Sequence, residues 1–402
     1  MPYMKNDRRG FIKKSGSLAA ALSIGGIGAY SASAGHNTSH EHNTSAGDTN
    51  SVVSTRAPQK IKWPLLEGPD TPKLTLNSSP NATVERMRMI KQIGADYVLM
   101  SGPPLPWTEA GLRAIMDRFK TEGLTVINMM INGYPNTLYG REGRDAEIEK
   151  IQASLRAAGA AGLPIVEYNF YAHRLTEGYY NIEGRGGSGY LGYDYNRVNP
   201  DTGVAPKDLP PKPEEGAHTK EELWGYLTYF LKAVIPVAEK AGVRMALHPN
   251  DPPAPISRGS EQIMSSFKDW RRLIDIVDSP SNGMTFDCGV STEIGEDALE
   301  VLRYLSSRDR INHVHYRNCL VEIPSTKYVE VFPDQGQVNM FAVMQELVRR
   351  KYRFGLFPEH PRGLDFDKTH PGGGDFAGYL YNQAYARAML QAVLTAEKAN
   401  NI

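Results

Sequence analysis

The chain has 402 residues, of which 41% are hydrophobic and 22% charged, a composition typical of a globular protein with a substantial core. Its 45 lysines and arginines balance 45 aspartates and glutamates, so the formal net charge is zero. That balance argues against a nucleic-acid-binding or anionic-membrane-binding surface. The two cysteines, Cys288 and Cys319, are too few for a disulfide framework or a zinc knuckle. The sequence leaves open whether they are bridged.

The first 34 residues have the pattern of an export signal. The run Arg8-Arg9-Gly10-Phe11-Ile12-Lys13 is similar to the twin-arginine signature, and an apolar stretch follows from Leu18 to about Tyr30. Small residues ending at Ala34 fit a cleavage site. The apolar stretch is shorter than the roughly 20 residues that a membrane span needs. We therefore predict a twin-arginine signal peptide over 1–34, a periplasmic or otherwise extracytoplasmic mature protein, and no stable membrane span after cleavage. An uncleaved anchor is the alternative.

Residues 35–60 are rich in Ser, Thr, Asn, His and Gly and almost free of apolar side chains. This composition predicts a disordered linker. The catalytic domain is then expected over 61–402.

From residue 73 onward, short apolar runs alternate with amphipathic helical stretches. The candidate strands are 73–76, 96–100, 124–130, 164–170, 243–248, 283–287, 311–315 and 353–358. The candidate helices are 82–93, 108–122, 145–161, 219–240, 260–277, 297–307, 338–351 and 376–397. Eight βα units in this order predict an α/β fold, a parallel (β/α)8 barrel of the TIM-barrel type. A doubly wound sheet would show a glycine-rich turn after its first strand, and none is present.

One long insertion, 171–218, interrupts the alternation after the fourth strand. It is rich in Gly, Tyr and Pro. A long loop at the C-terminal face of a barrel is usually a lid or a wall of the site. A disordered excursion is the alternative.

Metal-ligating residues stand at the ends of four consecutive predicted strands. Strand five finishes at His248, strand six at Asp287, strand seven at His315 and strand eight near Glu359. The C-terminal strand ends are where (β/α)8 barrels carry their chemistry. Each residue alone could be a hydrogen-bonded histidine or a helix cap, but together they predict a divalent metal site. Nitrogen and carboxylate ligands suit Mn²⁺, Fe²⁺, Co²⁺, Ni²⁺ or Zn²⁺.

Several segments resemble the mannonate dehydratase family. The clearest is 243–253, where His248 is followed by Pro-Asn-Asp-Pro-Pro. Other similar segments are Tyr168-Asn169-Phe170, Val314-His315-Tyr316-Arg317, Pro358-Glu359-His360 and Gly378-Tyr379. The resemblance covers roughly residues 160–385 and implies a metal-dependent lyase in the wider superfamily of xylose-isomerase-like barrels.

The resemblance also implies roles for individual residues. The implied metal ligands are His248, Asp287, His315 and Glu359, with Mn²⁺ the first choice of ion. The implied acid–base groups are His360 and Tyr379, and the implied substrate-binding residues are Arg317, Asn169 and Asp251.

Four positions depart from the family pattern. Asp287 stands where the family usually has Cys, and Glu359 stands where it has Asp. Both changes keep an anionic ligand. Upstream, Met100–Pro104 replaces a His-containing segment, and a family Glu is lost around Met129–Asn132. These changes leave open a different sugar acid or a different reaction.

The leading hypothesis is therefore β-elimination of water from D-mannonate to give 2-keto-3-deoxy-D-gluconate. A metal-dependent sugar isomerase or epimerase is the second hypothesis, favoured by Asp287. An exported, non-catalytic sugar-acid-binding protein is the third. We expect a small-molecule sugar acid as the ligand and a homo-oligomer as the assembly.

Overall fold

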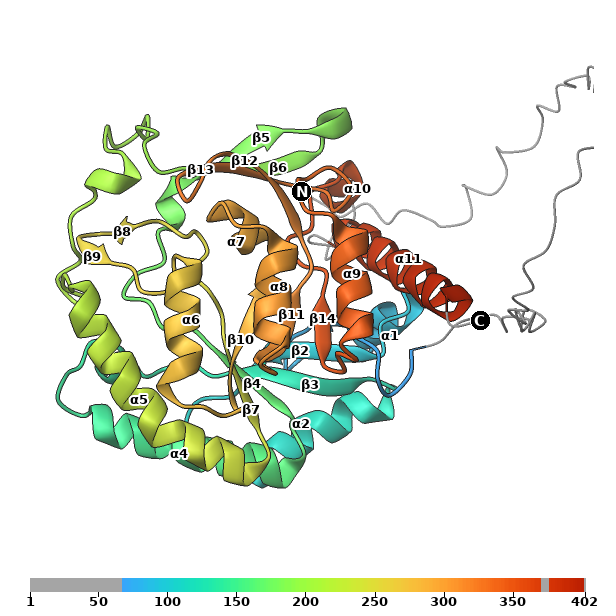
Figure 1. Ribbon diagram of the computed structural model, residues 1–402, viewed down its shortest axis with the longest axis horizontal. Helices are drawn as coiled ribbons and strands as arrows, with labels where there is room; N and C mark the ends of the chain where they lie inside the picture. Colours follow the sequence, from blue (N-terminus) through green and yellow to red (C-terminus); the bar gives the residue numbers. More distant parts are fainter. Residues whose placement is uncertain (1–66, 370–375, 401–402) are drawn as a thin grey trace, which may run out of the picture. The chain divides into compact units, whose positions relative to one another are not determined.

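The computed structural model describes residues 67–369 and 376–400 (Figure 1). The predicted signal peptide (1–34) and linker (35–60) lie outside the described residues. In the part of the chain that is described, no helix combines the length and the apolar character needed to cross a membrane.

Eight parallel strands close into a barrel (Figure 1). They are β1 (Lys73–Asn77), β2 (Tyr97–Ser101), β3 (Thr125–Met130), β4 (Ile165–Tyr168), β7 (Arg244–Leu247), β10 (Asn282–Asp287), β11 (Ile311–His315) and β14 (Gly355–Phe357). The first strand pairs with both β2 and β14 and so closes the ring. All eight predicted strands are confirmed, with ends shifted by one or two residues at most.

One long helix follows each barrel strand. They are α1 (Val84–Gln92), α2 (Glu109–Thr121), α4 (Arg144–Ala161), α5 (Lys220–Ala241), α6 (Phe267–Ile276), α8 (Ala298–Ser306), α9 (Met340–Arg349) and α11 (Phe376–Asn400). The predicted start of α5 is confirmed as a capping box between Thr219 and Glu222, which satisfies backbone donors at the helix N-terminus. The same helix ends at Gly242, whose φ of 71° gives the left-handed C-cap that glycine adopts without strain.

The predicted helix over 260–277 begins later than expected. Ser266 caps α6 through its hydroxyl, which accepts from the amide of Asp269. The residues before it form a small hairpin of β8 (Ile256–Ser257) and β9 (Ser260–Glu261).

The barrel strands are buried on both faces. Every residue of β10 and β11 is buried, because helices cover the outside of a parallel barrel and side chains fill its interior. Polar side chains in such strands must have polar partners. The buried histidines and carboxylates near the strand ends therefore indicate a candidate functional site.

A second sheet lies across one end of the barrel (Figure 1, top). This antiparallel sheet has the order β12-β13-β6-β5. Its strands are β5 (Tyr179–Glu183), β6 (Gly189–Asp194), β12 (Asn318–Ile323) and β13 (Lys327–Val331). The insertion 171–218 is therefore not a loop throughout, because it supplies β5 and β6 and three single 3-10 turns, η1 (Thr176–Gly178), η2 (Arg185–Gly187) and η3 (Pro206–Asp208).

The other half of this sheet comes from the chain after β11. Since β12 begins three residues beyond His315, the antiparallel sheet stands at the C-terminal ends of the barrel strands. Three short helices complete the described elements: α3 (Pro135–Leu138), α7 (Cys288–Glu293) and α10 (Asp365–Thr369). Both cysteines are buried and free.

Candidate metal centre and active site

The barrel brings the four predicted metal ligands to one point, and these four residues are named the metal group. His248 directly follows β7, Asp287 and His315 end β10 and β11, and Glu359 lies two residues beyond β14. One potential ligand atom from each of the four lies within 4.8 Å of the others. Consecutive strands of a parallel barrel end at the same rim, which is why residues spread over more than 100 positions meet here.

The spacing of these atoms fits a single cation. His315 Nδ1 lies 3.0 Å from His248 Nε2, 2.8 Å from Glu359 Oε1 and 3.6 Å from Asp287 Oδ2. Ligand atoms at about 2.0–2.2 Å from one ion are separated by roughly 3.0–3.6 Å. A single N–H of His315 can serve only one of these three neighbours, whereas a cation serves all of them. The residues present therefore fit a divalent metal.

Charge at the cluster points the same way. Burial opposes protonation of both His248 and His315. The pKa of His248 is lowered by this burial and by the neighbouring His315. For His315 the carboxylates of Glu359 and Asp287 outweigh burial and raise the pKa well above its usual range. A divalent cation would supply the positive charge that the His315 proton supplies here, and metal binding releases such protons.

Asp287 has two functions at once. Its Oδ1 accepts from the amide of Val290 at 2.8 Å and caps α7, while Oδ2 faces the histidines. The side chain is fully buried. Burial opposes its ionisation, but the nearby Arg317 guanidinium and the two imidazoles hold the pKa of Asp287 well below its usual range. The helix-capping and ligand interpretations of this position are therefore compatible.

A buried carboxylate faces the second ring nitrogen of His315. Oε1 of Glu167 on β4 lies 3.7 Å from His315 Nε2 and accepts a hydrogen bond from the hydroxyl of Thr285 at 2.7 Å. Its Oε2 accepts from Asn128 at 2.9 Å. Burial raises the pKa of Glu167, but the surrounding histidines lower it to about 2. Metal-ligating histidines commonly rest on a carboxylate in this way.

Arg317 lies behind the metal ligands rather than in open space. Its guanidinium is 2% exposed and contacts the carboxylates of Asp287 at 3.0 Å, Glu293 at 2.6 Å, Asp251 at 3.4 Å and Glu359 at 3.2 Å. The absence of a side chain at Gly289 makes space for the guanidinium, since a Cβ there would come within 2.5 Å of it. Arg317 neutralises the carboxylates of the site. Its predicted contact with substrate stays a prediction, and it does not line the cavity described next.

A cavity of about 160 Å³, the catalytic cavity, opens above the metal ligands. Six residues expected in the site line it: Asn169, His248, Asp251, His315, Glu359 and His360. Sequence reasoning missed three further lining residues, Met130, Tyr171 and Arg174. Tyr171 and Arg174 begin the insertion directly after β4, so their position just past a barrel strand end was the available signal. Met130 falls in the segment where the family glutamate is lost.

His360 faces this cavity from a fixed position. Its Nδ1 lies 2.7 Å from Glu330 Oε2, which also accepts from Arg362 at 2.8 Å. The other nitrogen, Nε2, lies 3.6 Å from both Asp251 Oδ2 and Glu359 Oε2. Burial lowers the pKa of His360, but the carboxylates of Glu330 and Glu359 outweigh burial and raise it. Glu330 holds the ring so that Nε2 points toward the metal group.

The antiparallel sheet also fixes Asp251. Its Oδ1 accepts from the hydroxyl of Tyr179 on β5 at 2.6 Å, and Tyr328 on β13 lies 3.4 Å away. Its Oδ2 lies 3.5 Å from Arg174 and 3.4 Å from Arg317. Burial opposes ionisation, but the two arginines and His360 lower the pKa of Asp251. Asp251 is therefore an anionic, hydrogen-bond-accepting wall of the cavity.

Tyr379, the other predicted acid–base residue, lies on α11. Its ring stacks on Phe357 with centroids 5.9 Å apart, and it is not among the described residues that line the catalytic cavity. Its predicted acid–base role stays a prediction. Tyr171 is the tyrosine that does line the cavity, and burial raises its pKa although Arg174 opposes that shift.

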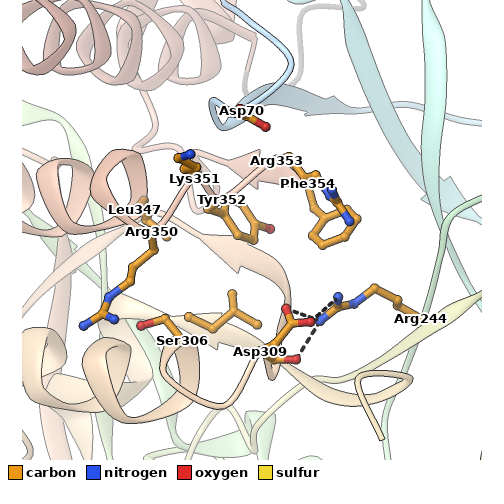
Figure 2. Close-up of a pocket in the computed structure, with 11 residues that line it drawn as sticks. Asp70, Arg244, Ser306, Asp309, Leu347, Arg350, Lys351, Tyr352, Arg353 and Phe354 are labelled. Carbon is orange, nitrogen blue, oxygen red and sulfur yellow. Dashed lines mark hydrogen bonds and ion pairs between the residues drawn. The ribbon is translucent and has the colours of Figure 1, made fainter. Parts of the chain in front are cut away.

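Another cavity, of about 220 Å³, lies at the opposite end of the barrel, where the strands begin (Figure 2). Figure 2 shows Arg244 there, paired with Asp309. None of the described residues that line it is a histidine or a cysteine. The chemistry-bearing groups thus gather at the C-terminal face, as in other barrels of this type.

Comparisons with known proteins agree with this geometry. A family model described as D-mannonate dehydratase (UxuA) matches residues 214–400. A mannonate dehydratase of Streptococcus equi subsp. zooepidemicus is 32% identical over 263 residues, which are 61% of this chain and 71% of that protein. Mannonate dehydratase 2 of Halalkalibacterium halodurans is 29% identical over 307 residues, covering 71% and 87% of the two chains.

Solved structures give the same picture. The mannonate dehydratase from Streptococcus suis serotype 2 superposes with a TM-score of 0.71 and 27% identity over 81% of this chain and 96% of that one. A D-tagatose 3-epimerase-like protein, at 14% identity and a TM-score of 0.51 over 81% and 99%, shares the fold. The sequence match, the barrel and the cluster of metal-ligating residues agree: this chain belongs to the mannonate dehydratase family.

Proposed function

We propose that this protein dehydrates D-mannonate to 2-keto-3-deoxy-D-gluconate with the help of a divalent metal, Mn²⁺ being our first choice. The observation that carries the proposal is the position of His360. Its Nε2 faces the cavity whose floor is formed by the metal-ligating residues, in a chain of the mannonate dehydratase family. An acid–base group beside a metal group is the arrangement that removal of a proton next to a carboxylate requires.

The four ligands His248, Asp287, His315 and Glu359 would hold the ion. Bound there, a divalent cation supplies electrostatic stabilisation for the charge that develops on the acid group and the C2 hydroxyl. Arg317 contributes by balancing the ligand carboxylates. In the cavity itself, Asn169, Asp251 and Arg174 offer hydrogen bonds that orient the hydroxyls and the acid.

The two proton transfers divide between His360 and a tyrosine. Glu330 accepts from Nδ1 of His360 and strengthens the basicity of Nε2, so this nitrogen is suited to remove the proton at C2. Burial keeps the hydroxyl of Tyr171 protonated by raising its pKa, so Tyr171 is suited to donate a proton to the departing C3 hydroxyl. Tyr379 remains the alternative donor.

The experiment is a product assay. Protein loaded with Mn²⁺ is incubated with D-mannonate and a panel of other aldonates, and 2-keto-3-deoxy acid is measured. We expect product from mannonate that is lost in His248→Ala and Glu359→Ala. Metal-loaded protein that forms no 2-keto-3-deoxy acid from any aldonate would refute dehydration.

Asp287 supports a second candidate function, isomerisation or epimerisation of a sugar. Aspartate rather than cysteine at this position is the ligand type of the wider barrel superfamily, and the fold is shared with an epimerase-like protein. Isomerisation and epimerisation lose no water, so the mass of the product distinguishes them from dehydration.

We also propose that residues 1–34 direct twin-arginine export and that the mature protein is a periplasmic homo-oligomer. The support is the run from Arg8 to Lys13 and the apolar stretch after it. Replacing Arg8 and Arg9 together by lysine is expected to retain the protein in the cytoplasm, as measured by fractionation. An unchanged distribution would exclude this route.

A further inference from the structure

A second cavity adjoins the catalytic cavity on the side of the antiparallel sheet. This outer cavity has a volume of about 500 Å³ and shares Arg174 and His360 with the catalytic cavity. Cavities that bind small molecules commonly measure about 300–1,000 Å³. The catalytic cavity, at about 160 Å³, is smaller than that range, whereas the outer cavity falls within it. The two together therefore have room for a ligand larger than one six-carbon acid.

The chemistry of the outer cavity favours a neutral ligand that carries hydroxyls. Both of its arginines already face a carboxylate, Arg362 that of Glu330 at 2.8 Å and Arg174 that of Asp251 at 3.5 Å, so neither guanidinium is left unpaired for a second acid or a phosphate. Glu330 Oε1 is buried and has no hydrogen-bond partner among the described residues, although its residue lines this cavity. A buried carboxylate oxygen without a donor is costly, and a ligand hydroxyl would satisfy it.

Other lining residues add contacts of the same kind. Asn181 on β5 is exposed, and the ring of Tyr190 on β6 forms part of the wall. An amide supplies both donors and acceptors to hydroxyls, and an aromatic ring supplies apolar contact area.

The catalytic cavity and the outer cavity adjoin at His360, which bears on how a substrate would extend between them. His360 lines both cavities. A substrate whose acid end lay at the metal group, with C2 and C3 beside His360, would therefore extend its remaining carbons toward the outer cavity. We propose that the outer cavity is a second sugar-binding subsite, and that the substrate is an aldonate that bears a glycosyl group on its distal hydroxyls. This inference rests on the proposed dehydration of an aldonate.

The test compares D-mannonate with 4-O-β-D-mannosyl-D-mannonate on the metal-loaded full chain. We expect kcat/KM for the disaccharide acid to exceed that for mannonate by at least about tenfold, since the second sugar adds a charge-assisted hydrogen bond that mannonate alone does not make. Asn181→Trp, which fills the outer cavity, is expected to remove this advantage while leaving the kinetics of mannonate unchanged. Asn196→Trp, an exposed position just beyond β6 that does not line the cavity, is the matched control.

The outcomes separate this inference from the function on which it rests. Turnover of mannonate with equal or lower kcat/KM for the disaccharide acid overturns the subsite and leaves dehydration standing. If neither compound is turned over, calorimetric titration decides the subsite independently. Tighter binding of the disaccharide acid, lost in Asn181→Trp and kept in Asn196→Trp, supports it, and equal or weaker binding overturns it.

Discussion

Replacing Glu330 by Gln tests whether the antiparallel sheet positions His360, the proposed acid–base residue. The substitution keeps the size of the side chain and one acceptor but removes the charge that faces His360 at 2.7 Å and Arg362 at 2.8 Å. Removing one partner of a buried ion pair typically costs about 3–5 kcal/mol, and Arg362 is only 5% exposed. We therefore expect a loss of about that size in the free energy of unfolding.

The kinetic effect should be separate from this loss of stability. A charge-assisted hydrogen bond is worth about 1.5–3 kcal/mol, so kcat should fall by roughly 10- to 100-fold, while KM changes less than about threefold. Because Glu330 raises the pKa of His360, its removal lowers that pKa. The acidic limb of the kcat profile should then move to lower pH, since His360 acts in its neutral form.

The assays are urea denaturation and steady-state kinetics over pH, with Glu330→Gln/Arg362→Met as the matched variant. The double variant removes the unpaired guanidinium, so it should regain stability relative to Glu330→Gln and yet stay slow. A kcat within twofold of the parent protein, or an unshifted acidic limb, would refute the positioning role of Glu330.

Four further predictions concern the metal and the cavity. Asp287→Ala should bind less than a tenth of the parent's Mn²⁺ by elemental analysis, and chelation should lower the Tm of the parent far more than that of the variant. Arg174→Met should raise KM about tenfold with unchanged stability, because its guanidinium is half exposed at the cavity. Arg317→Met should instead lower the unfolding free energy by several kcal/mol, because its buried carboxylate neighbours lose the guanidinium that they share. Tyr171→Phe should lower kcat at least tenfold, whereas Tyr379→Phe should leave it within about threefold; the reverse order in these kinetics would assign the hydroxyl to Tyr379.

The barrel could be predicted from the sequence because its signals are local and repeated. Most strands are short apolar or β-branched runs, and several helices have their own start or stop signal, as at Thr219 and Gly242. The metal group followed from the barrel itself, since the topology places all C-terminal strand ends at one rim. His248, Asp287, His315 and Glu359 therefore needed no information beyond their position at the strand ends.

The antiparallel sheet could not be predicted in the same way. Its strands β5 and β6 lie in a segment rich in glycine and tyrosine, and their partner β13 is far away along the chain. Pairing between distant segments leaves no periodic signal in either one. The functional residues that depend on this sheet were therefore missed, above all Glu330.

The residues that surround a side chain also could not be predicted from the sequence. The family resemblance implied that Arg317 contacts the substrate acid, and strand parity, which puts Arg317 on the same face as His315, agrees with that expectation. Parity gives direction but says nothing about neighbouring elements. Glu293 on α7 and Asp251 after β7 close around the guanidinium, while Arg174, at the start of the insertion, reaches the cavity.

The barrel and the antiparallel sheet contribute different residues to the site, and this has a consequence for the order in which the site assembles during folding. The metal ligands belong to the barrel strands and the residues just after them, whereas the sheet joins segments as far apart as Tyr179 and Tyr328, 149 positions along the chain. Long-range pairing of this kind forms late, because closing a large loop costs entropy before any contact repays it. The same holds for the barrel, which closes by the pairing of Lys73 on β1 with Gly355 on β14. In the order of assembly, both the four predicted metal ligands and the sheet contacts of Asp251 therefore come after the local helices and hairpins, because each set is brought together only when distant segments of the chain have paired.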